Sequence, residues 1–115
     1  DFRCSYNQLK TLKYSPKIIK GGYYCNNNEL TSLKDCPEIV NGYFNCSYNK
    51  LKSLEGLQKE IKGSFACGNN QLRSLEGCPK IVNGNFYCND NLLKSLKGGP
   101  KIINGDLNCR FNELE

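Results

Sequence analysis

The 115-residue sequence predicts a mainly β solenoid, with a parallel sheet of about six short strands and irregular or 3₁₀ segments on its convex side. A 21-residue repeat runs through the chain without insertion or deletion. Apolar residues alternate at a period of two in one part of each repeat, as in a strand with one buried face. Proline and glycine interrupt the remaining part. Such self-similarity at a fixed short period indicates stacked structural units.

We call residues at the same position of successive repeats a column, and two polar or weakly polar columns define the repeat register. Six cysteines recur every 21 residues, and six asparagines follow them three residues later. The columns are Cys4, Cys25, Cys46, Cys67, Cys88 and Cys109, then Asn7, Asn28, Asn49, Asn70, Asn91 and Asn112. We expect a cysteine ladder in the interior and an asparagine ladder at the turn, where amide side chains bond backbone groups that the turn leaves unpaired.

The strand of each repeat lies just before the asparagine. An aromatic residue precedes the cysteine by two, as in Phe44 and Cys46 or Phe65 and Cys67, so both should face the interior. Strands stacked in register at about 4.8 Å then give a parallel sheet.

The return limb follows, and it is too interrupted for a helix. Leucine columns fill the interior, and prolines rule out sheet pairing where they stand. A β-branched column includes Ile19 and Val40, and the glycine two residues later, such as Gly42, should supply either a positive φ or a close backbone approach.

Residues 27–40 (NNELTSLKDCPEIV) and 70–82 resemble the short leucine-rich repeats of bacterial secreted effectors, whose unit runs N-x-L-T-S-L-P-x-L-P-x-x-L. The G-x-F-x-C segment before the asparagine is similar to repeats of bacterial and phage genomes. This resemblance covers the whole chain and implies a leucine-rich-repeat solenoid. The V-x-G-x-F segment is one residue longer than the usual strand entry, and cysteine replaces the usual aliphatic residue. The sequence contains no counterpart of the effectors' catalytic domain.

We expect residues 1–115 to form a single domain of about five and a half repeats. No methionine occurs, so either an initiator was removed or the chain is an excerpt of a longer one, and the breaks in mid-repeat favour an excerpt. Histidine is absent and no nucleotide-binding motif occurs, so we expect no enzyme, no cofactor and no catalytic residues.

The cysteines are expected to be buried free thiols, because in-register side chains do not give the dihedral that a disulfide needs. The sequence lacks the C-x-x-C pairs that are typical of zinc sites, so no metal is expected. Reduced thiols predict a cytoplasmic location, in a bacterium or an infected host cell. No segment has the length or apolarity of a membrane span, so no membrane partner is expected.

The outward, concave face of the sheet is the predicted binding surface for a partner protein. Tyrosine supplies rigid contact area and asparagine adaptable hydrogen bonds, as in antibody paratopes. The candidate residues are Tyr6, Tyr24, Asn26, Tyr43, Asn45, Tyr48, Asn85, Tyr87 and Asn89. Strand propensity alone accounts for the same composition, but the tyrosines of adjacent repeats should form one aromatic patch. The family resemblance suggests a phage or bacterial inhibitor or effector.

Two other functions remain as alternatives. Net charge is +5, and two columns of cations could follow the phosphates of a nucleic acid, although solvated edges explain them better. These columns are Lys10, Lys52, Arg73 and Lys94, and Lys17, Lys59, Lys80 and Lys101. The other alternative is end-to-end self-association of a structural element, since the first and last rungs lack polar caps.

Overall fold

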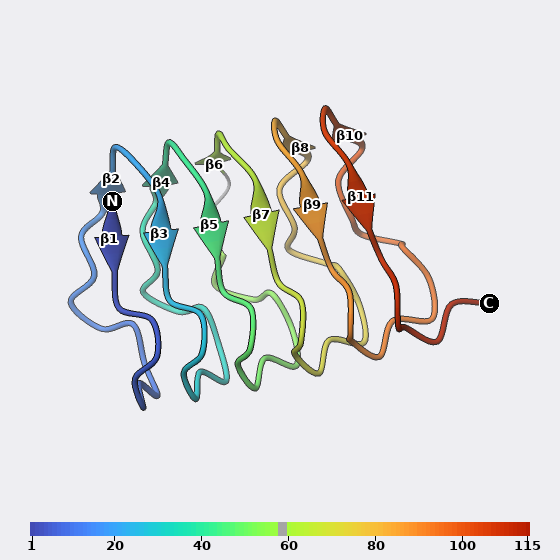
Figure 1. Cartoon of the computed structure of the whole chain (residues 1–115), viewed down its shortest axis with the longest axis horizontal. Helices are drawn as coiled ribbons and strands as arrows, with labels where there is room; N and C mark the ends of the chain where they lie inside the picture. The colour runs from blue at the N-terminus through green and yellow to red at the C-terminus, as the bar shows by residue number, and fades with distance from the viewer. Residues whose placement is uncertain (58–59) are drawn as a thin grey trace.

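The computed structural model describes residues 1–57 and 60–115 and is a parallel β-solenoid of about five turns. Each turn of 21 residues stacks on the next along the long axis of a body measuring 39 × 28 × 19 Å (Figure 1). All regular elements in the described part are strands. The predicted mainly β solenoid is therefore confirmed.

A six-stranded parallel sheet forms one face of the solenoid (Figure 1). Its register is 21 residues throughout, with Phe2 opposite Tyr23 and Phe44 opposite Phe65. Backbone amides continue the ladder beyond the strands, since the Cys46 amide donates to the Ala66 carbonyl at 2.9 Å. The strands are β1 (Phe2–Arg3), β3 (Tyr23–Tyr24), β5 (Phe44–Asn45), β7 (Phe65–Ala66), β9 (Phe86–Tyr87) and β11 (Leu107–Asn108).

The return limbs carry a second set of short strands that the sequence did not predict. They form a three-stranded and a two-stranded parallel sheet, again with a 21-residue register. The three-stranded sheet contains β2 (Ile18–Ile19), β4 (Ile39–Val40) and β6 (Glu60–Ile61); the other contains β8 (Ile81–Val82) and β10 (Ile102–Ile103). Pairs of β-branched residues favour strands at four of these five positions, and β6 has one β-branched residue, Ile61.

The core lies between the two sets of strands. Tyr23, Phe44, Phe65 and Phe86 are fully buried in one column, and the neighbouring rings contact each other in sequence. The hydroxyl of Tyr23 is satisfied by Ser15 at 2.8 Å. Leucine and β-branched columns complete the interior as predicted, and burial decreases at the last rung, where Leu96 is 40% exposed.

Each return limb contains one turn in which a backbone amide donates to the carbonyl three residues earlier, as from Cys36 to Leu33 at 3.1 Å. The third residue of every such turn has a positive φ, so glycine or a short polar residue suits it best. We call these residues the turn column: Tyr14, Asp35, Gly56, Gly77 and Gly98.

The glycines before the strands of the large sheet have a different role from these turn glycines. Their φ values are not positive, but a Cβ on Gly42 would lie 2.8 Å from the backbone carbon of Gly21. Close backbone approach, the second of the two predicted reasons, therefore explains this column. No helix in the described residues is long and apolar enough to cross a membrane.

The asparagine ladder is present and follows the predicted chemistry. Nδ2 of Asn49 donates to the carbonyls of Cys25 and Cys46 at 3.1 Å, and its Oδ1 accepts from the Leu30 amide at 3.0 Å. Asn28 and Asn91 repeat the pattern. Each amide therefore joins two successive turns of the solenoid and supplies partners for backbone groups at the corner.

The cysteine ladder lies inside the solenoid. Cys25, Cys46, Cys67 and Cys88 are fully buried thiols, and the Sγ of Cys46 donates to the Ala66 carbonyl at 3.3 Å. Burial raises the pKa of the Cys46 and Cys67 thiols well above the ordinary value. These thiols are therefore neutral apolar fillers in this environment.

Candidate functional site

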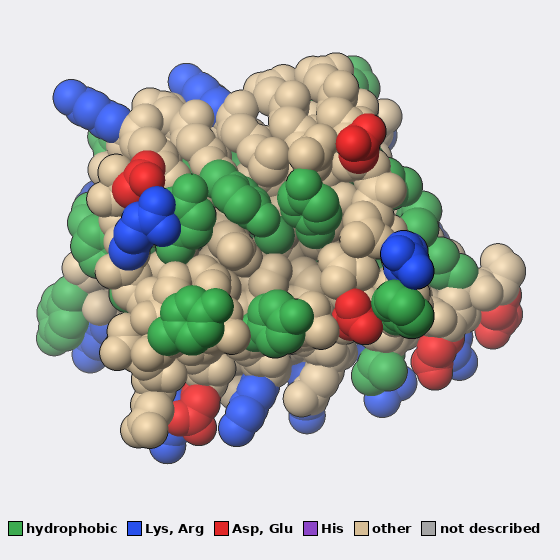
Figure 2. Space-filling view, in the orientation of Figure 1, with side chains coloured by type: hydrophobic (Ala, Val, Ile, Leu, Met, Phe, Trp, Pro, Cys, Tyr) green, Lys and Arg blue, Asp and Glu red, His purple; other side chains and the backbone are tan. Residues whose placement is uncertain are grey.

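A shallow groove of about 330 Å³ crosses the outward face of the large sheet. It runs along the solenoid axis, across the strands, between two rows of aromatic side chains (Figure 2). We call it the aromatic groove. Its lining residues are Tyr6, Asn26, Asn27, Tyr43, Asn45, Ser47, Tyr48, Ala66, Asn69, Tyr87 and Asn89.

The first row of aromatic residues is held together by ring contacts. The ring centroids of Tyr24 and Tyr43, on adjacent turns, lie 5.7 Å apart in an edge-to-face arrangement. Those of Tyr43 and Tyr87 lie 6.5 Å apart, although Tyr43 and Tyr87 are two turns apart. Contacts of this geometry fix the orientation of the rings before any ligand binds.

Small residues on β7 allow the contact between Tyr43 and Tyr87. Ala66 is the outward residue of the intervening strand, yet it is only 2% exposed. The two rings therefore cover Ala66, and a larger side chain would hold them apart. The hydroxyl of Tyr87 also accepts a hydrogen bond from Asn85 Nδ2 at 2.8 Å.

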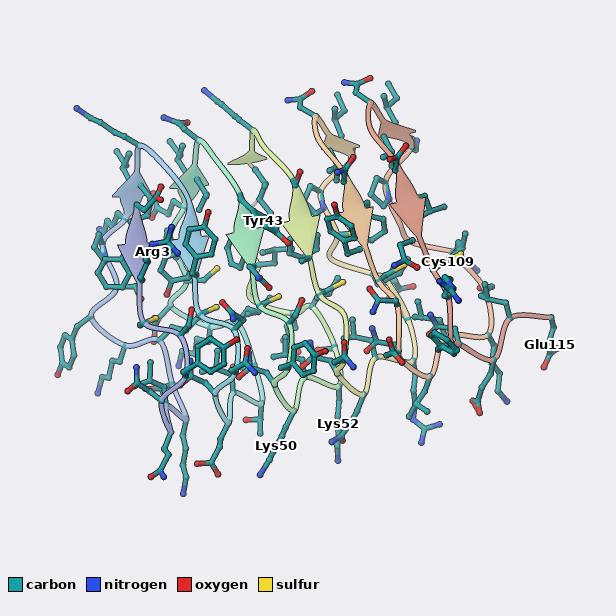
Figure 3. All side chains as sticks on the ribbon, in the orientation of Figure 1. Arg3, Tyr43, Lys50, Lys52, Cys109 and Glu115 are labelled. Atoms are coloured by element: carbon teal, nitrogen blue, oxygen red, sulfur yellow. The ribbon has the colours of Figure 1, made fainter. Side chains whose placement is uncertain are left out.

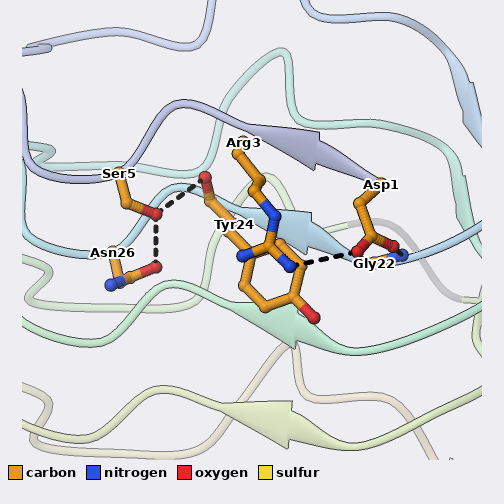
Figure 4. A network of polar contacts seen from close by, with 6 residues as sticks. All are labelled: Asp1, Arg3, Ser5, Gly22, Tyr24 and Asn26. Carbon is orange, nitrogen blue, oxygen red and sulfur yellow. Dashed lines mark hydrogen bonds and ion pairs between the residues drawn. The ribbon is translucent and has the colours of Figure 1, made fainter.

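A network of polar contacts fixes the N-terminal end of this row (Figure 4). The guanidinium of Arg3 lies 4.2 Å from the centre of the Tyr24 ring and pairs with Asp1 at 3.2 Å. A Cβ on Gly22 would lie only 2.7 Å from the Tyr24 ring, so glycine at this position makes room for the ring. Tyr24 is consequently packed against its neighbours and does not line the groove.

The second row lies at the corner where the chain leaves the strand, and every residue there has a positive φ between 51° and 58°. Tyr6 and Tyr48 are 78% and 55% exposed. Asparagine and aspartate adopt this backbone at low cost, whereas a bulky aromatic residue does so with strain. We call this set the left-handed corner: Tyr6, Asn27, Tyr48, Asn69, Asp90 and Phe111.

The polar residues of the groove differ in how far their hydrogen bonds are satisfied. Asn26 Nδ2 donates to Asn27 Oδ1 at 2.8 Å, and Asn89 Nδ2 donates to Asp90 at the same distance. Asn45 is fixed differently, because its Oδ1 accepts from the Ser47 amide at 3.0 Å. Within residues 1–57 and 60–115, the Nδ2 of Asn45 has no hydrogen-bond partner.

The lining of the aromatic groove contains no charged residue, although the chain has a net charge of +5. Lys50 and Lys52 project from the edge of the sheet away from Tyr43 (Figure 3). The described lysines and arginine of the two predicted cation columns are all exposed; Lys59 lies outside the described residues. Burial, followed by the neighbouring Tyr87 and Tyr24, raises the pKa of Tyr43 to about 12.

The structure brings together most of the residues predicted to bind a partner. All of them line the groove except Tyr24 and Asn85, which support the first row from outside it. The predicted single patch is two rows, because Tyr43 contacts Tyr24 and Tyr87 in the first row whereas Tyr48 belongs to the left-handed corner. Sequence reasoning omitted Asn27, Ser47, Ala66 and Asn69, which stand in the same repeat columns as residues that it chose.

Comparison of the chain with models of protein families, curated proteins and solved structures gives no match. The resemblance to leucine-rich repeats therefore stays a prediction. No group of three or more His, Cys, Asp or Glu side chains in the described part is placed to hold a metal ion.

Proposed function

We propose that the chain is a protein-recognition module that binds its partner through the aromatic groove. The observation that carries this proposal is the presence of exposed aromatic residues at the left-handed corner. Tyr6 and Tyr48 both have a φ of 57°, are more than half exposed and line the groove. Each adds backbone strain without adding burial, so their presence is better explained by contacts with another molecule than by stability.

The composition and rigidity of the groove support the same proposal. Tyrosine and asparagine dominate its lining, and tyrosine is one of the residues most enriched among binding hot spots. Contacts among Tyr24, Tyr43 and Tyr87 hold one row in place, which reduces the entropy lost on binding. The resemblance to bacterial and phage repeats suggests an inhibitor or effector that acts on a host protein.

Nucleic-acid binding fits the groove less well. Affinity for a phosphate backbone depends on lysine and arginine contacts, and the lining residues of the groove include neither. Of the exposed cations, Lys50 and Lys52 point away from the groove, whereas Arg3 stacks on Tyr24 at the end of the first row without lining the groove (Figure 3).

Replacement of Tyr48 by asparagine tests the proposal. Asn27 and Asn69 already occupy equivalent positions, so Tyr48→Asn should keep the fold and remove only the exposed ring. We expect a partner protein, captured from an extract of the source cells and quantified by mass spectrometry, to decrease roughly tenfold or more.

Tyr14→Asn is the matched control. Tyr14 also has a positive φ and is 92% exposed, but it lies on a return-limb turn away from the groove. It should retain the partner at the wild-type level. Equal capture by the wild-type protein and both variants would contradict the proposal.

A further inference from the structure

We infer that the aromatic groove binds a proline-rich segment of its partner in the polyproline II conformation, with the segment parallel to the solenoid axis. The inference rests on the proposed function, because it names the chemistry of the partner for the same groove. Three properties of the groove support it: the spacing of its exposed rings, the kind of hydrogen-bonding group that it offers, and its lack of charge.

The spacing of the exposed rings matches one turn of a polyproline II helix. Tyr6 and Tyr48 are two turns of the solenoid apart, and Asn27 stands between them. Two strand spacings of about 4.8 Å place these positions about 9.6 Å apart along the axis. Three residues of polyproline II advance about 9.3 Å, so equivalent faces of successive ligand turns would meet successive rings.

An extended β segment does not match this spacing. Side chains on one face of a β-strand recur at about 6.7 Å, which would lose register with the rings after one step. In an α-helix, side chains on one face recur every seven residues, about 10.5 Å along its axis. Its backbone groups are bonded to each other, however, so the polar groups of the groove would have no partners. Only polyproline II combines the spacing with a backbone that still needs hydrogen bonds.

The groove offers hydrogen-bond donors, which is what a proline-rich backbone requires. Proline has a carbonyl acceptor but no amide hydrogen. Asn45 is held by its oxygen, so its Nδ2 donor remains available toward the groove. Asn69 also lines the groove, and no hydrogen bond of its side chain occurs within the described residues. The Tyr43 hydroxyl lines the groove and is a further donor, because a tyrosine is protonated at neutral pH.

Charge complementarity points the same way. The lining is uncharged on a chain of net charge +5, so an uncharged segment enters without the desolvation of an ion. Proline-rich segments are also prefolded and lose little entropy on binding to aromatic grooves. The lining extends from Tyr6 on the first turn to Asn89 on the fifth, about 19 Å, which corresponds to about six residues of ligand.

The test uses the whole chain and a fluorescein-labelled polyproline peptide of about ten residues, long enough to span the groove. Fluorescence anisotropy should show saturable binding to the wild-type protein and to Tyr14→Asn. Binding to Tyr48→Asn should be weaker by roughly tenfold or more. A glycine-serine peptide of equal length should not bind. Thermal unfolding of each variant confirms that the fold is retained.

NMR on the same samples locates the binding site. The polyproline peptide should shift the side-chain amide signals of Asn45 and Asn69. The amide of Asn49 is buried in the asparagine ladder and should stay unchanged. Shifts at Asn49 and throughout the core, or shifts confined to residues outside the groove, would overturn the inference.

Other outcomes separate this inference from the proposed function. No binding of polyproline, or equal or tighter binding of an alanine-rich helical peptide or a neutral β-linked oligosaccharide, would overturn the inference. Loss of partner capture on Tyr48→Asn would still support the proposed function in that case. Equal binding of polyproline to the wild-type protein and Tyr48→Asn would also overturn the inference, because the exposed ring would then not contribute.

Discussion

The left-handed corner and the turn column place similar demands on the backbone but contain different residues. Both have positive φ values on consecutive turns of the solenoid. The turn column contains Asp35 and three glycines among its five members, and its exception is Tyr14. At the left-handed corner three of the six members are aromatic, Tyr6, Tyr48 and Phe111, and the others tolerate this backbone. The residues of the turn column are mostly those that adopt a positive φ at low cost. The corner instead retains strained aromatic residues beside a groove.

Alkaline titration tests the core that supports both regions and should have the largest effect. Burial raises the pKa of the Cys78 and Cys88 thiols to about 12 from an ordinary value of 9.0, and raises those of Cys46 and Cys67 well above it. The unfolded chain therefore releases protons that the folded chain keeps. Stability is present in full below about pH 9 and decreases as the pH rises toward about 12.

Denaturant unfolding at a series of pH values measures this decrease. Cys78→Ala removes one titrating thiol and should make the decrease less steep. A free energy of unfolding that stays constant to pH 12 would show that the thiols are not held in an apolar interior.

Asn49→Ala tests the residue that follows Tyr48 at the corner. The substitution leaves the carbonyls of Cys25 and Cys46 and the amide of Leu30 without their partner. We expect a loss of about 3 kcal/mol in the free energy of unfolding, measured by denaturant titration. Asn45→Ala removes one partly exposed contact to Ser47 and should cost less than about 1 kcal/mol. Equal costs would contradict the distinction between the asparagine ladder and the groove.

Tyr48→Asn should have a smaller effect on stability than Asn49→Ala, and the effect should be favourable. Relief of the left-handed strain stabilises the fold by about 1 kcal/mol, which corresponds to an increase in Tm of roughly 4 °C. Tyr14→Asn should stabilise the fold by a similar amount, because the same backbone strain is relieved. Differential scanning calorimetry measures both. If Tyr48→Asn lowers Tm, the ring contributes to the fold and its retention needs no binding partner.

Much of the fold could be predicted because the sequence repeat translates directly into spatial neighbours. Residues 21 apart pair in the sheets, so the columns of phenylalanine, cysteine and asparagine become stacks in the structure. The second set of strands at Ile18–Ile19 and its equivalents was missed. Two-residue strands give too short a pattern to separate from an irregular segment.

The candidate site was predicted less completely than the fold. The sequence identified the outward columns, but it placed Tyr48 in one patch with Tyr24, Tyr43 and Tyr87. Column membership determines which way a side chain faces, but not how far a ring reaches along the solenoid axis. Contact between Tyr43 and Tyr87 depends on the small size of Ala66, and the position of the Tyr24 ring depends on Gly22.

The sequence by itself determined the 21-residue turn, the parallel pairing and the inward position of the thiols, because all three follow from a local pattern repeated at one fixed offset. Only the tertiary structure decided that two rows of tyrosines face each other across a groove. Only the tertiary structure also decided that Tyr6 and Tyr48 adopt left-handed backbone. These features depend on how unlike residues on neighbouring turns fill the space between them, and a repeat pattern does not contain that information.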